Sequence, residues 1–293
     1  MASISASDSF RLPVFQTLKG IYTFLWSVRR DFVLTTALPV FALTVYHVAA
    51  INLLGAVGST TAGGERLPTF WDIPVLYLPS LLLYTIFAVA WHRRYLLKDE
   101  ASTAWSALAW DVTKTRFLFR SVLILLIAAA LVSVPIVILT IFGVVLNFAA
   151  ASENTPPVDV ATLSSMVIIM ASVIFFILYL RLSIWLPATA IEAPISFLEL
   201  VHLGRYNSWR ILAIVFGAEI GPSLLFILLS ILANKFPESS TSIGLIIELI
   251  QNALAYAVLT AGITALSAVY DRLLARLSND PLYTQVGMPF INE

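Results

Sequence analysis

Six long apolar runs are the feature that most restricts what this chain can fold into. They cover residues 32–54, 73–91, 117–147, 162–185, 211–232 and 243–270. The hydrocarbon core of a bilayer is about 30 Å thick and is crossed by roughly 20 residues of α-helix. Runs of this length predict an all-α membrane protein with six transmembrane helices, in which residues 1–293 form a single transmembrane domain.

The composition agrees with lipid as the solvent. Of the 293 residues, 59% are hydrophobic and 12% are charged, whereas soluble domains carry about 25% charged residues. A chain this apolar cannot cover itself with polar surface. Because it has no cysteine, it contains no disulfide, no thiolate nucleophile and no cysteine metal site.

Three amphipathic segments precede the first, third and fifth runs, at residues 9–29, 99–116 and 194–209. In the first, apolar residues recur at helical spacing and are flanked by cations, which is typical of a helix lying in a membrane interface. Packing of this helix against the protein itself is the alternative. The first, third and fifth runs each contain a proline, at positions 39, 135 and 222. We therefore expect three hairpins, each preceded by an interfacial helix on the cytoplasmic side.

Charge predicts the orientation, because Lys and Arg are retained on the cytoplasmic side of short loops. Fifteen of the 17 Lys and Arg residues lie in the N-terminal segment, in the two even-numbered loops and in the tail; Arg66 and Lys235 alone lie in the odd-numbered loops. Six crossings with both termini in the cytoplasm fit this distribution.

One stretch carries a resemblance to a known family. It contains Arg181, Ser183, Pro187 and Ala188 after the fourth run, and then Asn207, Trp209 and Arg210 before the fifth. With the Trp91-His92-Arg93 exit from the second run, it resembles the membrane domain attached to some glycerophosphodiester phosphodiesterases, and stand-alone bacterial relatives of that domain. The resemblance covers about a third of the chain. It implies a multi-pass protein of the bacterial inner membrane and carries over no activity.

Glu219 is the most distinctive polar residue, because it lies about 12 Å into the fifth run at 1.5 Å per residue. Acidic residues inside membranes usually face a partner or a water-filled cavity. Gly217, Gly221 and Pro222 surround it, so a kink there could free backbone carbonyls. Counted from the other surface, Gln251 and Asn252 have a similar depth. Glu219 is therefore either a packing group bonded to one of them or a proton or cation site.

His47 and Glu248 form a second candidate pair, which would meet if the first and sixth runs are neighbours. Both fall in the outer leaflet by residue count. The structural alternative for His47 is a hydrogen-bonded core residue.

The arginines at the cytoplasmic face are candidate contacts for anionic lipid, because such clusters attract anionic headgroups. They are Arg93, Arg94, Arg116, Arg181, Arg205 and Arg210. Arg181 and Glu192 flank Pro187 and could pair with each other. The alternative is that these cations only determine topology.

No enzyme motif occurs in the sequence, and the three histidines lack metal-ligand spacing. We expect no cofactor and no nucleic-acid partner. Three hypotheses follow: a non-catalytic membrane protein that organises lipid or a membrane protein complex, a transporter or channel with its site at Glu219, and a membrane-embedded lipid-modifying enzyme. The expected partners are membrane lipids, anionic ones included, and a membrane protein or further copies of this chain.

Overall fold

The computed structural model describes residues 11–57, 72–98, 109–152, 160–204, 206–233 and 241–278. Within these ranges the chain is almost wholly helical and contains no β-strand, which confirms the all-α class. The helices are α1 (Val14–Ser27), α2 (Arg29–Val57), α3 (Asp72–Leu96), α5 (Val112–Ser152), α6 (Val160–Ser183), α7 (Trp185–Ala190), α8 (Phe197–Leu203), α9 (Ser208–Ala233) and α10 (Thr241–Ser278).

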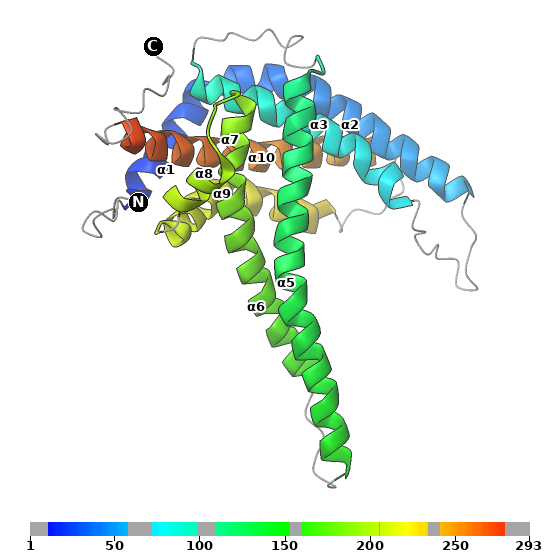
Figure 1. The fold of residues 1–293 in the computed structure, drawn as a ribbon. Helices are drawn as coiled ribbons and strands as arrows, with labels where there is room; N and C mark the ends of the chain where they lie inside the picture. Colours follow the sequence, from blue (N-terminus) through cyan, green and yellow to red (C-terminus); the bar gives the residue numbers. More distant parts are fainter. Residues whose placement is uncertain are drawn as a thin grey trace.

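The helices form two parts that point in different directions (Figure 1). We call α1, α2, α3, α9 and α10 the body, in which α10 contacts each of the other four helices. We call the paired helices α5 and α6 the arm, because they project away from the body as a hairpin. The short helix α7 lies at the junction and contacts α3, α5 and α10.

Five helical stretches are long and apolar enough to cross a membrane. They are Arg29–Ala50, Val112–Val145, Ser165–Ala190, Ser208–Ala233 and Ile243–Ala275. The remaining predicted run, 73–91, forms most of α3, which ends with Arg93 and Arg94 in its last turn and is not among the five. These helices make the chain a multi-pass membrane protein by length and composition, and the sixth crossing stays a prediction.

The start of α5 corrects the second predicted interfacial helix. Residues 99–108 of that segment lie outside the described residues, but Val112 to Arg116 already belong to α5. Asp111 stands at the N-cap, where its Oδ1 accepts a hydrogen bond of 2.8 Å from the Lys114 backbone N–H. An aspartate in this position satisfies one of the free N–H groups of the first turn. The cap therefore starts the long helix five residues earlier than the predicted boundary.

The third predicted interfacial helix is shorter than expected. Of residues 194–209, only Phe197–Leu203 form a separate helix, α8, and Ser208 already begins α9. Ser196 and Glu199 fix the start of α8, because the Glu199 carboxylate accepts hydrogen bonds of 3.0 and 2.8 Å from the Ser196 backbone N–H and hydroxyl. The Ser196 hydroxyl oxygen in turn accepts a hydrogen bond of 3.3 Å from the Glu199 backbone N–H, and this reciprocal arrangement is a capping box.

The stretch that links α6 to α7 is buried on two opposite sides. One stripe packs into a cluster with α1, α9 and α10, and the other packs into a cluster with α2, α3 and α5. The first stripe is Leu180, Ile184 and Ala188, and the second is Leu182, Leu186 and Ala190. Residues four apart share a face of a helix, so this segment joins the two hydrophobic clusters.

Candidate functional site

The proline break in α9 is covered by a side chain from α1. Pro222 lies inside α9, and because proline has no N–H, the carbonyl of Ala218 loses its usual helical partner. The Tyr22 hydroxyl lies 3.3 Å from that oxygen and donates a 2.6 Å hydrogen bond to the preceding carbonyl, that of Gly217. The carbonyls that the sequence predicted to be freed at this position are therefore bonded within the protein.

Close packing of α1 on α9 brings Tyr22 to the break. A Cβ atom added at Gly217 would lie 2.9 Å from Leu18 Cδ1, so only glycine leaves room for this leucine without a shift. Nearer the start of α9, Asn207 Oδ1 accepts a 2.9 Å bond from the Leu12 N–H, and Arg210 donates one of 2.7 Å to the Leu12 carbonyl. The two helices are thus joined at both ends of their contact.

Glu219 points into α10 at Gly262. A Cβ atom at position 262 would lie 2.2 Å from Glu219 Oε1, so the glycine makes the space that the carboxyl group fills. The carboxyl group is also close enough to Tyr179 of α6 to interact with it electrostatically. Glu219 therefore lies where α6, α9 and α10 meet, in contact with the protein on more than one side.

The predicted partners of Glu219 lie elsewhere. Gln251 Nε2 lies 3.5 Å from Ser230 Oγ, so the antiparallel register of α9 and α10 places Gln251 eleven residues from Gly262. At 1.5 Å per residue this is about 16 Å. The prediction was wrong because it counted the depth of Gln251 from the start of the apolar run at residue 243, whereas α10 begins at Thr241 and has 38 residues against 26 in α9. Gln251, ten residues from the start of α10, has not reached the level of Glu219.

Asn252, the other predicted partner, belongs to a polar cluster that joins α2, α3 and α10. His47 Nδ1 lies 3.1 Å from Glu248 Oε1, and His47 Nε2 lies 3.2 Å from Ser80 Oγ. Asn252 Nδ2 donates to Glu248 Oε1 over 3.2 Å and to Thr44 Oγ1 over 3.0 Å. The structure thus brings His47 and Glu248 together, as the sequence suggested for neighbouring helices, and adds Asn252 to the pair.

The hydrogen bonds of this cluster connect three helices. The Thr44 hydroxyl donates to the Val40 carbonyl over 2.9 Å, so its oxygen accepts from Asn252. His47 therefore links α2 to α10 through Glu248 and to α3 through Ser80.

Two of the predicted lipid-contacting arginines bond to the protein. Arg94 donates a 2.5 Å hydrogen bond to Asp31 Oδ2 and links α3 to α2. Arg210 donates a hydrogen bond to the Leu12 carbonyl. These bonds give both side chains a structural role.

The other four arginines differ in environment. Arg116 is exposed, Arg93 and Arg181 are half-buried, and Arg205 lies outside the described residues. The charge of Arg93 acts on Asp111. Glu192, the residue predicted to pair with Arg181, accepts a short hydrogen bond from the Thr113 hydroxyl.

Burial acts to raise the pKa of the Asp111 carboxyl at the α5 cap, but other effects outweigh it. These are the hydrogen bonds from the Lys114 backbone and ammonium and the positive charges of Lys114 and Arg93, so the pKa lies below its usual range. The Lys114 side chain is nearly buried and also donates to the Ala109 carbonyl. Asp111 and Lys114 thus fix the point where α5 begins.

The sequence analysis did not predict two interactions at the junction. The Arg120 guanidinium lies 4.1 Å from the ring centroid of Trp185 and donates a 2.7 Å hydrogen bond to Thr189 Oγ1. His92 was assigned to the cationic exit of α3, yet it is 1% exposed and its Nδ1 lies 2.7 Å from Ser267 Oγ. Ser267 donates its own proton to the Ile263 carbonyl, so His92 is the donor in this pair.

The sequence of α10 contains a pattern from which the burial of His92 could have been predicted. Small residues recur there at steps of four, including Ala261, Ala265, Thr260, Thr264 and Ala268. Such spacing lets membrane helices approach closely, and every residue from Ala261 to Tyr270 is buried. Trp91 of α3 also donates a 2.9 Å bond to Thr264. The two stripes of small residues on α10 therefore indicate that other helices pack closely against it at the level of Trp91 and His92.

In the described ranges, no three His, Asp or Glu side chains gather as a metal site requires. Comparison of the chain with protein-family models, with curated proteins and with solved structures finds no match.

Proposed function

We propose that this chain is a non-catalytic integral membrane protein, crossing the bacterial inner membrane six times, that organises lipid or a membrane protein complex. One observation carries the proposal: the arm is apolar on its outer sides and stands away from the body. The absence of enzyme motifs in the sequence motivates the non-catalytic role.

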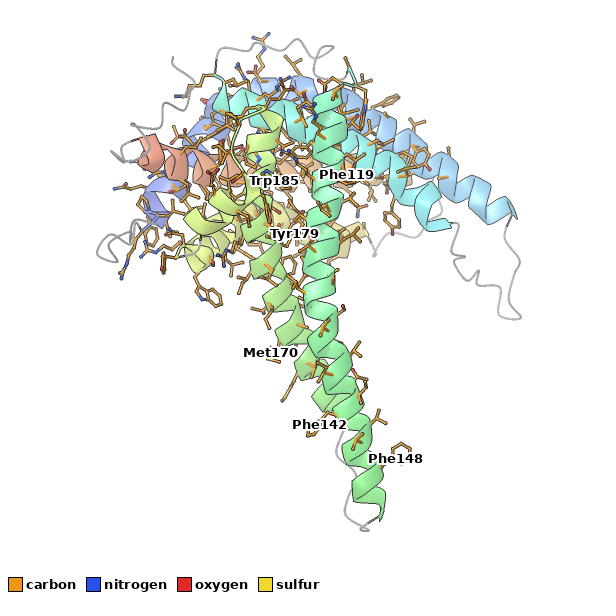
Figure 2. All side chains as sticks on the ribbon, viewed as in Figure 1. Phe119, Phe142, Phe148, Met170, Tyr179 and Trp185 are labelled. Atoms are coloured by element: carbon orange, nitrogen blue, oxygen red, sulfur yellow. The ribbon has the colours of Figure 1, made fainter. Side chains whose placement is uncertain are left out.

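Large apolar side chains cover the arm along its length. Phe142 and Phe148 of α5 and Met170 of α6 point outward from it (Figure 2). Further exposed members are Val134, Val137, Ile138, Ile141, Val144, Val145, Ile168, Ile169 and Val173. Monomeric soluble proteins rarely expose apolar patches larger than a few hundred Å². Lipid chains or an apolar partner inside the membrane fit this surface.

The directions of the body helices support six alternating crossings with α3 as the second. His47 and Thr44 of α2 meet Glu248 and Asn252 of α10 in antiparallel order. Between α3 and α10, Trp91 meets Thr264 and His92 meets Ser267, so these two helices run in parallel. Both relations are those expected of the first, second and sixth crossings of one membrane.

Crossing a single bilayer also requires the arm and the body to share a direction. Transmembrane helices tilt by up to about 40° from the membrane normal, and the arm diverges from the body in Figure 1. Six crossings of one bilayer therefore require a smaller angle between the arm and the body than the one in Figure 1.

The contacts of Glu219 favour the packing role over the transporter alternative. Its carboxyl group fills the space above Gly262, and Leu18 and Tyr22 of α1 cover the neighbouring break. A transport site would need this region to open. The transporter hypothesis predicts that Glu219→Gln abolishes a pH-dependent flux in proteoliposomes, and the packing role predicts that no such flux exists to be lost.

Native mass spectrometry of the protein, extracted gently with its surrounding lipid, tests the proposal. A stoichiometric membrane-protein subunit or a retained specific lipid is the expected result. A chain released alone, with neither partner nor lipid, contradicts it, and turnover of an added phospholipid in liposomes would establish an enzyme instead.

A further inference from the structure

We propose that one face of α1 is a binding surface for the anionic headgroups of the membrane. Its residues are Phe15, Lys19, Tyr22 and Trp26, followed by Arg29 at the start of α2. We call this face the α1 stripe. The inference rests on the proposed membrane role and names the lipid class and the contact residues.

The α1 stripe follows from the spacing of its residues. Steps of four, three and four from Phe15 to Trp26 keep them within about 40° of one line at 100° per residue. All four are exposed; Phe15 is 86% and Trp26 is 72% exposed. Aromatic side chains beside a lysine on one face are typical of helices at a membrane interface, where the rings lie at headgroup level.

The two flanks of the α1 stripe have different partners. On one side, Val14, Leu18, Ile21 and Leu25 pack against the core shared with α9 and α10. The other side is polar and exposed; it consists of Gln16, Gly20, Thr23 and Ser27. The α1 stripe therefore lies between a face that packs against the protein and a face that is polar and exposed. This is the position in which a helix presents aromatic rings to the lipid headgroups.

The body holds the α1 stripe in a fixed orientation. The bonds of Leu12 to Asn207 and Arg210 anchor one end of α1, and the Tyr22 hydroxyl bond to Gly217 anchors its middle. Lipid binding to a prearranged surface requires little further ordering of side chains. The exposed Trp209, next to Arg210 in α9, adds an aromatic ring near this anchor.

Charge selects anionic lipid over zwitterionic lipid. Residues 11–30 contain Arg11, Lys19, Arg29 and Arg30 and no acidic residue. The Arg29 guanidinium lies 5.0 Å from the ring centroid of Trp26, so its cation lies beside the aromatic side chain, and it forms no ion pair with any carboxylate in the described part of the chain. Arg94, by contrast, is neutralised by Asp31. Lipid binding at the α1 stripe thus uses cations other than the six arginines expected from the sequence.

A fluorescent label on a single introduced cysteine tests this inference, since the chain has no cysteine of its own. Thr23→Cys places the label beside the α1 stripe, and Phe142→Cys places a control label on the exposed surface of the arm. Each protein is reconstituted in nanodiscs that contain spin-labelled phosphatidylglycerol or spin-labelled phosphatidylcholine. We expect phosphatidylglycerol to quench the label at position 23 more strongly than phosphatidylcholine, and both lipids to quench the label at position 142 equally.

Charge removal then identifies the residues responsible. Lys19→Gln and Arg29→Gln should each lower the preference for phosphatidylglycerol by up to about fivefold, the share expected of one cation near a membrane surface. Lys19→Arg, which keeps the positive charge at that position, should leave the preference unchanged.

The possible failures are distinguishable. Equal quenching by the two lipids at position 23, or a preference that survives both charge removals, overturns the inference and leaves the proposed function intact. An unquenched label at position 142 overturns the proposed function, because the arm would then lie outside lipid.

Discussion

Tyr22→Phe should destabilise the protein through the proline break in α9, and the effect should depend on Pro222. The variant removes a hydroxyl that donates to Gly217 and lies 3.3 Å from the Ala218 carbonyl. One side-chain hydrogen bond contributes about 0.5–1.5 kcal/mol in proteins and about 0.6 kcal/mol on average between membrane helices. We therefore expect a loss of about 1 kcal/mol, or about a fivefold change in the unfolding equilibrium.

The dependence on Pro222 follows from the backbone. In Pro222→Ala, the new N–H at position 222 can donate to the Ala218 carbonyl, which then no longer needs the tyrosine. The bond from Tyr22 to the Gly217 carbonyl remains in this background, so Tyr22→Phe should still cost about half as much, and the double-mutant cycle should give a coupling of about 0.5 kcal/mol.

Reversible unfolding in mixed micelles, followed by the fluorescence of the seven tryptophans, measures these free energies. Tyr77→Phe is the matched control, because Tyr77 is 66% exposed on α3, and its cost should be near zero. An equal cost of Tyr22→Phe in the presence and absence of Pro222 would refute the account of the break.

Three further predictions concern the junction, the polar cluster and the α5 cap. Arg120→Lys should cost about 1 kcal/mol in the same unfolding assay, because an ammonium cannot reproduce the planar contact with Trp185; an unchanged midpoint contradicts this. Glu248→Ala should cost more than Glu248→Gln, since the amide keeps an acceptor for Asn252, and equal costs would exclude a role for these bonds. Asp111 has a lowered pKa, so the stability it contributes is present above the ordinary aspartate pKa of about 3.9 and is lost as the pH falls through its lower folded value. Amide exchange in the first turn of α5 should rise over that acidic range in the wild type, and Asp111→Asn should remove the dependence; the same rise in both proteins would show that Asp111 is not its source.

The helical class and the positions of most helices could be predicted, because a long apolar run in lipid forms an α-helix. Local chemistry corrected the boundaries. Asp111 and Ser196 cap the first turns of α5 and α8, whose starts the apolar pattern alone did not define. The pairing of His47 with Glu248 was accessible from residue counts, because both lie on helices whose depths could be estimated from nearby ends.

The contacts of Glu219 could not be predicted in the same way. Its position opposite Gly262 depends on the register of α9 against α10, which the length of α10 sets and no pattern in the sequence states. The sequence indicated that Pro222 frees a carbonyl, but the donor comes from Tyr22, almost 200 positions earlier in the chain. Sequence periodicity also cannot separate the two buried stripes of the α6–α7 stretch from a lipid-facing helix, since both are apolar on all sides.

The location of the arm is the central claim, and labelling of single cysteines tests it most directly. Ile138→Cys in α5 and Ile169→Cys in α6 place thiols on its exposed apolar surface. In intact proteoliposomes, a membrane-impermeant maleimide should modify neither thiol until detergent is added. Rapid modification of both without detergent would place the arm in water and contradict the proposed function.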